Sequence, residues 1–124
     1  MEIPGVIIIP VAPKTKKNSQ RIVIGKKGKP IIIQSEAYKD YEEAALYYLR
    51  PIGIDYPVNI RCLFYMPTHR RVDLTNLLES IDDVMVKAGT LKDDNCEILA
   101  GHDGSRVYYD KDDPRTEIYI EEIE

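Results

Sequence analysis

Apolar residues between positions 74 and 88 recur at helical spacing, and this segment constrains the fold more than any other part of the chain. At 100° per residue they fall in one stripe, which predicts a helix with one buried face. The stripe consists of Leu74, Leu77, Leu78, Ile81, Val84, Met85 and Ala88. Gly89 follows directly and is expected to end the helix, because glycine readily adopts the left-handed conformation found after helices. A one-sided helix of this kind requires a second layer that covers its apolar face.

The remaining segments predict a sheet and one more helix. Residues 35–50 begin with Ser35 as a helix N-cap and end before Pro51. The apolar positions expected to face the core there are Ala37, Tyr41, Ala44, Ala45, Tyr48 and Leu49. Strands are expected in "GVIIIPVAP", in both halves of "RIVIGKKGKPIIIQ", in "YPVNIRCLFYMP", in "CEILAGHDGSRVYY" and in "TEIYIEEI". The stretch "HDGS" is expected either to bend its strand or to form a hairpin. The order βββαβαββ predicts an α+β fold, with two helices packed on one small mixed, mostly antiparallel sheet.

Length and cysteine content restrict the class of protein further. The 124 residues predict a single domain over positions 1–124 that is large enough to bury a core. Cys62 and Cys96 lie far apart and form no CxxC motif, so both are expected to be buried thiols in a reducing compartment. The longest apolar run, "VIIIPVAP", is too short to span a bilayer, and no basic leader precedes it. A cytoplasmic protein without a membrane segment is therefore expected.

The charges are unevenly distributed along the chain. The net charge is −4, yet no acidic residue occurs between Glu2 and Glu36. The basic residues in that interval are Lys14, Lys16, Lys17, Arg21, Lys26, Lys27 and Lys29. Contacts with DNA phosphates depend on local rather than total charge, so this segment is a candidate DNA-binding surface. A lysine-rich hairpin kept soluble by its charge explains the same pattern, and charge alone does not separate the two explanations.

Acidic residues stand at both ends of the helix over residues 74–88. Asp73 precedes its first turn, and Asp94 lies in the turn after Gly89. Helix capping explains Asp73, and a tight turn explains Asp94 because aspartate satisfies its own backbone there. Alternatively, the two ends meet in space and gather carboxylate oxygens around a metal ion. The spacing leaves both explanations open.

Polar residues between these two ends favour the metal explanation. On the helical wheel, a polar row follows one shoulder of the buried face and consists of Asn76, Ser80, Asp83 and Lys87. A carboxylate on that shoulder is partly shielded from water, which is unfavourable unless a cation compensates its charge. The helix dipole also disfavours Asp82 and Asp83, because they lie in the later half of the helix. Glu79 and Asp82 are expected to point into solvent.

The donor types indicate which metal would fit. His69 and His102 are isolated in the sequence, so a zinc site is not expected. The candidate metal ligands are Asp73, Asp94 and Asp83. They offer only hard oxygen donors, which suit Mg²⁺ or Mn²⁺. Such an ion holds phosphate oxygens, lowers the pKa of a bound water and stabilises a leaving oxygen. Arg70 and Arg71 lie immediately upstream and are placed to orient a phosphate.

The stretch "MPTHRRVDLTNLLESIDDVMVKAGTLKDDNCEIL" closely resembles the signature of the RusA family of Holliday junction resolvases. The shared features are an arginine-flanked D-L-T-N-L, an aspartate within the following helix, a glycine exit, and D-D before a strand. The stretch "PVAPKTKKNSQRI" is similar to the family's opening proline strand and Lys/Asn loop, and "TEIYIEEI" is similar to its final strand. The resemblance covers most of the chain and is most specific over residues 66–99.

The resemblance implies a compact endonuclease that works as a homodimer, with Mg²⁺ or Mn²⁺, on four-way DNA junctions in recombination and repair. Such a junction has approximate two-fold symmetry, so a two-fold protein would nick two opposed strands symmetrically. The residues expected to contact the backbones of branched DNA are Lys14, Lys16, Lys17, Asn18, Arg21, Arg70 and Arg71. The family is frequent in phages and prophages, so the cytoplasm of a bacterial or phage-infected cell is the expected location.

Position by position, the resemblance implies a catalytic set consisting of Asp73, Thr75, Asn76, Asp83 and Asp94. Two positions depart from the best-studied branch of the family. Thr75 stands where that branch has a second catalytic aspartate, and a hydroxyl is a weaker metal ligand. Glu79 stands where that branch has an important lysine, so Lys87 or the lysines of residues 14–17 would have to serve instead. Two other functions therefore stay open: a non-catalytic DNA-binding relative, and a small α+β module that binds protein or metabolite and whose acids are structural.

Overall fold

The computed structural model describes residues 2–16 and 20–123, without the side chains of residues 20, 21 and 34. The predicted contacts of Lys17 and Asn18, and those of the Arg21 side chain, lie outside this range. The elements are β1 (Ile7–Ile9), β2 (Gln20–Ile24), β3 (Pro30–Gln34), α1 (Glu36–Tyr48), β4 (Val58–Met66), α2 (Leu74–Lys87), β5 (Leu99–Gly101), β6 (Arg106–Tyr109) and β7 (Arg115–Glu122). This α+β arrangement confirms the predicted fold class.

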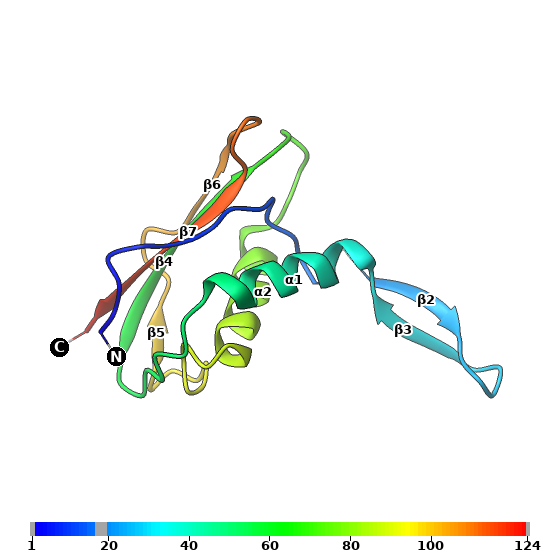
Figure 1. Cartoon of the computed structure of the whole chain (residues 1–124), viewed down its shortest axis with the longest axis horizontal. Coiled ribbons are helices and arrows are strands. Elements are labelled where there is room, and N and C mark those ends of the chain that lie inside the picture. The colour runs from blue at the N-terminus through cyan, green and yellow to red at the C-terminus, as the bar shows by residue number, and fades with distance from the viewer. Residues whose placement is uncertain (1, 17–19, 124) are drawn as a thin grey trace.

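The main sheet has the order β1-β7-β4-β5, and β6 also pairs with β4 (Figure 1). β7 is antiparallel to β1 and to β4, whereas β5 and β6 run parallel to β4. β5 and β6 lie one after the other along the same edge of β4, with Leu99 opposite Val58 and Arg106 opposite Leu63. The "HDGS" stretch therefore interrupts one strand and does not form a hairpin.

The core lies between this sheet and the two helices. Along β4 the side chains of Val58, Ile60, Cys62 and Phe64 alternate inward and are fully buried, as the sequence pattern predicts. Helix α2 contributes Leu77, Ile81, Val84 and Met85 to the same cluster. The helix ends at Lys87, and Gly89 follows with φ +78°, so the predicted glycine stop is confirmed. The buried face of α2 thus fixes the helix against the sheet, with Asp73 at its start and Gly89 just after its end.

Helix α1 differs from its sequence prediction in the face that it buries. Ser35 caps it as expected, because its Oγ accepts a hydrogen bond of 3.2 Å from the Tyr38 backbone N–H. The buried residues of the helix are Tyr38, Tyr41 and Ala45, whereas Tyr48 is exposed. Tyr38 was not among the expected core positions. Burial in this layer raises the pKa of Tyr38 to about 12.

The two cysteines lie in different environments. Cys62 is buried in β4, as expected, and burial raises the pKa of its thiol. Cys96 is exposed in the turn before β5, so the expectation of a buried thiol is wrong for this residue. The turn that carries Cys96 also carries Asp94, and the side chains of Asp93 and Asn95 there accept hydrogen bonds from backbone N–H groups of the same turn.

Strands β2 and β3 form the predicted hairpin, but they make a two-stranded sheet of their own. The hairpin follows β1 in the chain, precedes α1, and projects away from the rest of the molecule (Figure 1). The expectation of a single sheet is therefore wrong at this point. None of the helices in residues 2–16 and 20–123 is both long and apolar enough to cross a membrane.

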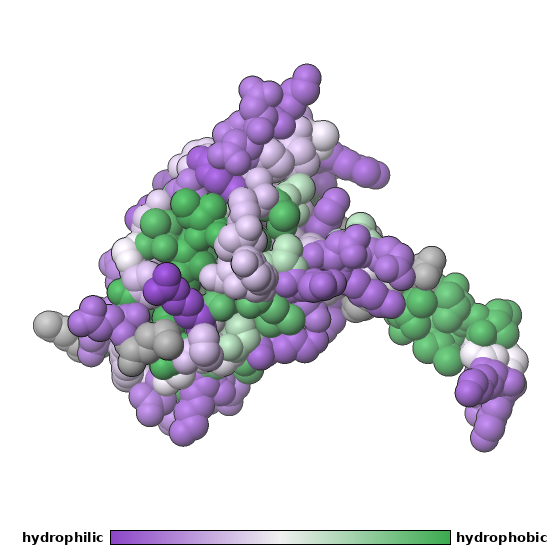
Figure 2. Space-filling model, in the orientation of Figure 1, coloured by the Kyte–Doolittle hydropathy of each residue, from purple (hydrophilic) through white to green (hydrophobic). Residues whose placement is uncertain are grey.

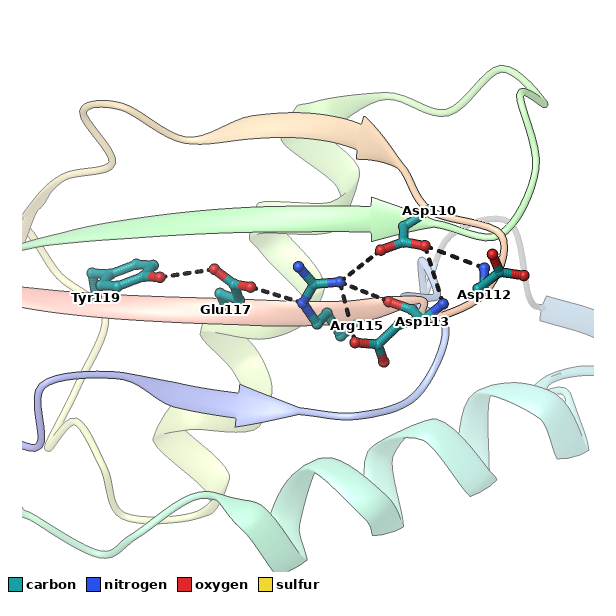
Figure 3. A network of polar contacts seen from close by, with 6 residues as sticks. All are labelled: Asp110, Asp112, Asp113, Arg115, Glu117 and Tyr119. Atoms are coloured by element: carbon teal, nitrogen blue, oxygen red, sulfur yellow. Dashed lines mark hydrogen bonds and ion pairs between the residues drawn. The ribbon is translucent and has the colours of Figure 1, made fainter.

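The sheet face turned away from the helices carries a polar network centred on Arg115 (Figure 3). Thr116 and Ile118 of β7 point into the core, so Arg115 and Glu117 point outward. The Arg115 guanidinium donates to Glu117 at 2.7 Å and to Asp110 at 3.0 Å. The hydrogen bond from Arg115 lowers the pKa of the Asp110 carboxyl. This network ties the β6–β7 loop to the sheet, which is a structural role.

Candidate functional site

The start of α2 holds a carboxylate that does not cap the helix. Asp73 is the N-cap residue, with extended backbone angles of φ −90° and ψ 125°, but its side chain makes no capping hydrogen bond. Its Oδ2 instead accepts a hydrogen bond of 3.3 Å from Nδ2 of Asn76. Asp73 is exposed and Asn76 is half-buried. The capping explanation of Asp73 therefore loses its main support, and the carboxylate is available to another partner.

A basic groove ends beside this carboxylate. Its walls are the loop after β1 and the segment between β4 and α2, and it has a volume of about 530 Å³. The basic side chains on its walls are Lys14, Arg70 and Arg71. Val72, the residue before Asp73, closes the groove. A DNA phosphate in this groove would meet positive charge, and Asp73 is the next residue in the chain after this lining.

Arg70 and Arg71 also line a second, open groove along β6. The other walls include His69 and Tyr109, whose rings lie 3.7 Å apart between centroids. Basic side chains interleaved with exposed aromatic rings are typical of surfaces that bind nucleic acid. The two arginines thus separate two grooves that open to solvent on either side of the β4–α2 segment.

Three polar residues on the shoulder of α2, Ser80, Asp83 and Lys87, each contact another part of the chain. Ser80 is buried, and its Oγ accepts a hydrogen bond of 2.8 Å from the Lys16 backbone N–H. Lys16 Nζ lies 3.6 Å from Asp83 Oδ2. Lys87 pairs with Glu42 on α1 at 2.7 Å. These two contacts of Lys16 tie the loop after β1 to α2, and its expected contact with DNA stays a prediction.

Asp82 was expected to face solvent, and this expectation is wrong. Its side chain is only 14% exposed, and its Oδ2 lies 2.9 Å from Nε2 of His102. Nδ1 of His102 lies 2.7 Å from the Ile60 carbonyl oxygen. His102, expected to be isolated, therefore joins α2 to β4. The two residues are 20 positions apart, and only the return of the chain along β4 brings them together, so no sequence spacing could have revealed the pair.

The Asp82–His102 pair is electrostatically coupled to the turn after α2. Burial raises the pKa of the Asp82 carboxyl, His102 lowers it, and the negative charges of Asp94 and Asp83 raise it further. For His102, burial lowers the pKa, but the hydrogen bond and charge of Asp82 outweigh burial and raise it overall. Asp94, in the turn after α2, is thus one of the negative charges that raise the pKa of Asp82.

The carboxylates at the two ends of α2 do not assemble into one cluster within a single chain. In the described ranges, no three His, Cys, Asp or Glu side chains form a group that could hold a metal ion. Asp73 contacts Asn76, Asp83 contacts Lys16, and Asp94 is exposed near Asp82. Mg²⁺ commonly takes one or two carboxylates and fills its other positions with water and substrate phosphates. The hard oxygen donors of Asp73 and Asn76, which follow the basic groove in the chain, fit such a water-rich site.

Replacement of His102 by Gln is expected to change how stability depends on pH. Because folding raises the pKa of His102, protonated His102 stabilises the folded state, and this stabilisation is complete below the unfolded pKa of about 6.5. The stabilisation is lost as the pH rises through the higher pKa that His102 has in the folded state. The variant should therefore lose about 1–3 kcal/mol of unfolding free energy near pH 6 and less near pH 8. Urea unfolding across this range measures the difference, with His69→Gln as the matched control; parallel profiles for His102→Gln and the wild type would contradict the pairing.

Comparison with known proteins adds two findings. The sequence model of the family described as endodeoxyribonuclease RusA matches residues 10–121. A crossover junction endodeoxyribonuclease RusA from Aquifex aeolicus (strain VF5) is 33% identical over 81 residues, which is 62% of this chain and 63% of that protein. The chain thus spans less than two thirds of the length of this relative. The matched range includes the basic groove and the whole of α2.

Proposed function

Because the chain belongs to the endodeoxyribonuclease RusA family, we propose that it is a Mg²⁺-dependent nuclease that resolves four-way DNA junctions by paired, symmetric nicks. The observation that supports this proposal best is the basic groove that ends beside Asp73. Its lysine and arginines suit a DNA phosphate. Val72 lines the groove, and the next residue in the chain, Asp73, carries a carboxylate that does not cap the helix. A purely structural acid would be expected to cap the helix or pair with a neighbouring cation.

Each side chain at the start of α2 has a defined part in the proposal. Asp73 is the principal metal ligand, and Asn76 positions its carboxylate through the 3.3 Å hydrogen bond. Lys14, Arg70 and Arg71 hold the scissile phosphate in the groove. Thr75, on the first turn of α2, is a further proposed donor. Asp83 and Asp94 also stay proposed donors, although in the described part of a single chain they do not form one cluster with Asp73. A bound divalent ion supplies Lewis-acid stabilisation of the charge that develops on the phosphate oxygens.

We also propose that the protein acts as a homodimer on branched DNA. A four-way junction presents two equivalent strands, and a two-fold assembly presents two equivalent sites to them. Sequence-independent recognition is expected, because the groove side chains Lys14, Arg70 and Arg71 suit phosphates rather than base edges. The same feature makes binding dependent on ionic strength.

Replacement of Arg71 by Gln is expected to weaken DNA binding uniformly across sequences. Loss of one phosphate contact should lower the slope of log affinity against log salt by about 1. Arg50→Gln is the matched control, because Arg50 is exposed at the end of α1 and lies outside both grooves. Fluorescence anisotropy with a labelled four-way junction between 50 and 200 mM salt (the range over which such slopes are resolved) measures both quantities. Equal slopes for Arg71→Gln and the wild type would remove Arg71 from the DNA contact.

The proposal as a whole is tested with a synthetic four-way junction. With Mg²⁺ or Mn²⁺ we expect paired nicks at symmetric positions in two opposed strands, and no cleavage with a chelator. Binding without cleavage under every divalent ion would instead establish the non-catalytic DNA-binding alternative. An absence of salt-dependent DNA affinity would leave the small binding module as the surviving alternative.

A further inference from the structure

The hairpin of residues 20–34, called the arm below, exposes an unusual amount of apolar surface. Among the strands of residues 2–16 and 20–123, β2 and β3 pair with each other and with no other strand. The relative exposures are 72% for Ile22, 78% for Ile24, 63% for Ile32 and 47% for Ile31. Isoleucine is among the residues most often buried in folded proteins. Figure 2 shows this apolar patch on the projecting part of the molecule, with hydrophilic side chains at its far end.

Both faces of the arm are apolar. Ile22 lies opposite Ile32 in the strand register, and Val23 lies opposite Ile31. Because side chains alternate between faces, Ile22, Ile24 and Ile32 share one face, while Val23 and Ile31 share the other. A two-stranded hairpin is at best marginally stable alone in water, and apolar, unpaired strand edges invite association. The arm therefore has the chemistry of a segment that is covered by another surface.

The charge of the arm indicates what covers it. The arm contains Arg21, Lys26, Lys27 and Lys29 and no acidic residue. The whole chain has 17 basic and 21 acidic residues. Without the four basic residues of the arm, 13 basic and 21 acidic residues remain, so the rest of the chain carries a net charge of −8. The arm and the remainder of a second copy are thus complementary in charge. DNA would match the lysines but would leave the isoleucines against a hydrated phosphate backbone.

The rest of the chain outside residues 20–34, called the body below, offers a surface that combines carboxylates with an exposed aromatic ring. On α1, Asp40, Glu43 and Tyr47 follow one another at helical spacing and are all exposed. Tyr47 is 82% exposed, the highest value among the large apolar and aromatic side chains of the described residues. Carboxylates beside an exposed aromatic ring match a segment with lysines at its tip and isoleucines along its length.

We infer that the arm binds the body of a second copy of this chain, so that reciprocal exchange of two arms forms the homodimer. The inference takes the two-fold assembly from the proposed function and assigns its interface. The exchange covers both apolar arms at once and brings each basic tip to an acidic body. A closed two-fold contact of this kind leaves no arm free to recruit further copies.

The apolar contact is tested by the double substitution Ile22→Thr with Ile32→Thr, compared with Ile22→Val with Ile32→Val. Threonine and valine are both β-branched and nearly equal in size, so strand propensity is retained in both variants. Valine loses one methyl group relative to isoleucine, whereas threonine also replaces a second methyl group by a hydroxyl. Sedimentation velocity should show a dimer for the wild type and for the valine variant. The threonine variant should dissociate, with a dimer Kd raised at least about 100-fold, because four side chains change per dimer. Association of the threonine variant at the wild-type Kd would overturn the inference.

The charge contact is tested on the unmodified protein. A mixture of ¹⁴N-labelled and ¹⁵N-labelled chains is treated with a carbodiimide, which joins lysines to carboxylates in direct contact. Peptides that link Lys26, Lys27 or Lys29 of one isotope to an acidic residue of the other are expected. If these lysines form links only within one isotope, or none at all, the arm does not bind a second copy.

Failure of this inference is distinguishable from failure of the proposed function, because junction cleavage is measured on the same samples. A wild-type protein that is monomeric at every concentration and still cuts a junction would overturn the arm exchange and leave the nuclease. A dimer that loses association in the threonine variant but never cuts would leave the arm exchange and overturn the nuclease.

Discussion

Replacement of Asp73 by Asn is expected to reduce four-way junction cleavage at least about 1,000-fold, since a metal ion supplies several kcal/mol of transition-state stabilisation. The substitution keeps the shape of the side chain and removes the anionic oxygen that we propose as the main metal ligand. Junction binding should persist or tighten, because one negative charge beside the phosphate groove disappears. Single-turnover cleavage and anisotropy binding, measured at one salt concentration, separate the two effects.

Asp112→Asn is the matched control for this experiment. Asp112 is exposed in the loop between β6 and β7 and lines neither groove. The control should cut at the wild-type rate. Cleavage by Asp73→Asn at the rate of this control would show that the carboxylate at the start of α2 has no part in the chemistry.

Replacement of Ile81 by Ala is expected to lower the free energy of unfolding by about 2–5 kcal/mol. Ile81 is fully buried on α2, within the cluster that joins this helix to β4, so truncation leaves a cavity that the packed layers cannot close. Urea unfolding measures the loss. Because the same helix carries Asp73 and Asn76, cleavage by this variant should also fail at a lower temperature than cleavage by the wild type.

Ile123→Ala provides the comparison, because Ile123 follows β7 and is exposed. Its substitution should change the free energy of unfolding by less than about 0.5 kcal/mol. If Ile81→Ala lowered the free energy of unfolding by less than about 1 kcal/mol, the apolar face of α2 would not be what holds this helix against the sheet.

The parts of the fold that depend on local periodicity could be predicted from the sequence. The stripe of α2 and the stop at Gly89 follow from apolar spacing and from one glycine. The alternation of Val58 and Ile60 along β4 shows in the same way which strand face is buried. These features can be predicted without knowing which distant residues make contact, because the spacing of apolar residues along the chain alone indicates which face of a helix or strand is buried.

The parts that depend on long-range contacts could not be predicted. Asp82 lies at the border between the buried and exposed faces of α2, and its burial depends on His102, which arrives from another element. The β2–β3 pattern predicts a hairpin, but nothing in it says that the hairpin leaves the main sheet. At the candidate site, the position of Asp73 at the head of α2 was predictable, and its hydrogen bond to Asn76 is local, three positions along the same helix. The groove was not predictable, because the loop after β1 has to return to form one of its walls.

A crystal of the protein soaked in Mn²⁺ with a bound four-way junction tests the central claim most directly. We expect an anomalous scattering peak with a carboxylate oxygen of Asp73 about 2.0–2.3 Å away and a phosphate of the junction among the other ligands. A fully occupied Mn²⁺ position that contacts DNA but not Asp73, or no ion near the start of α2, would contradict the proposed nuclease site.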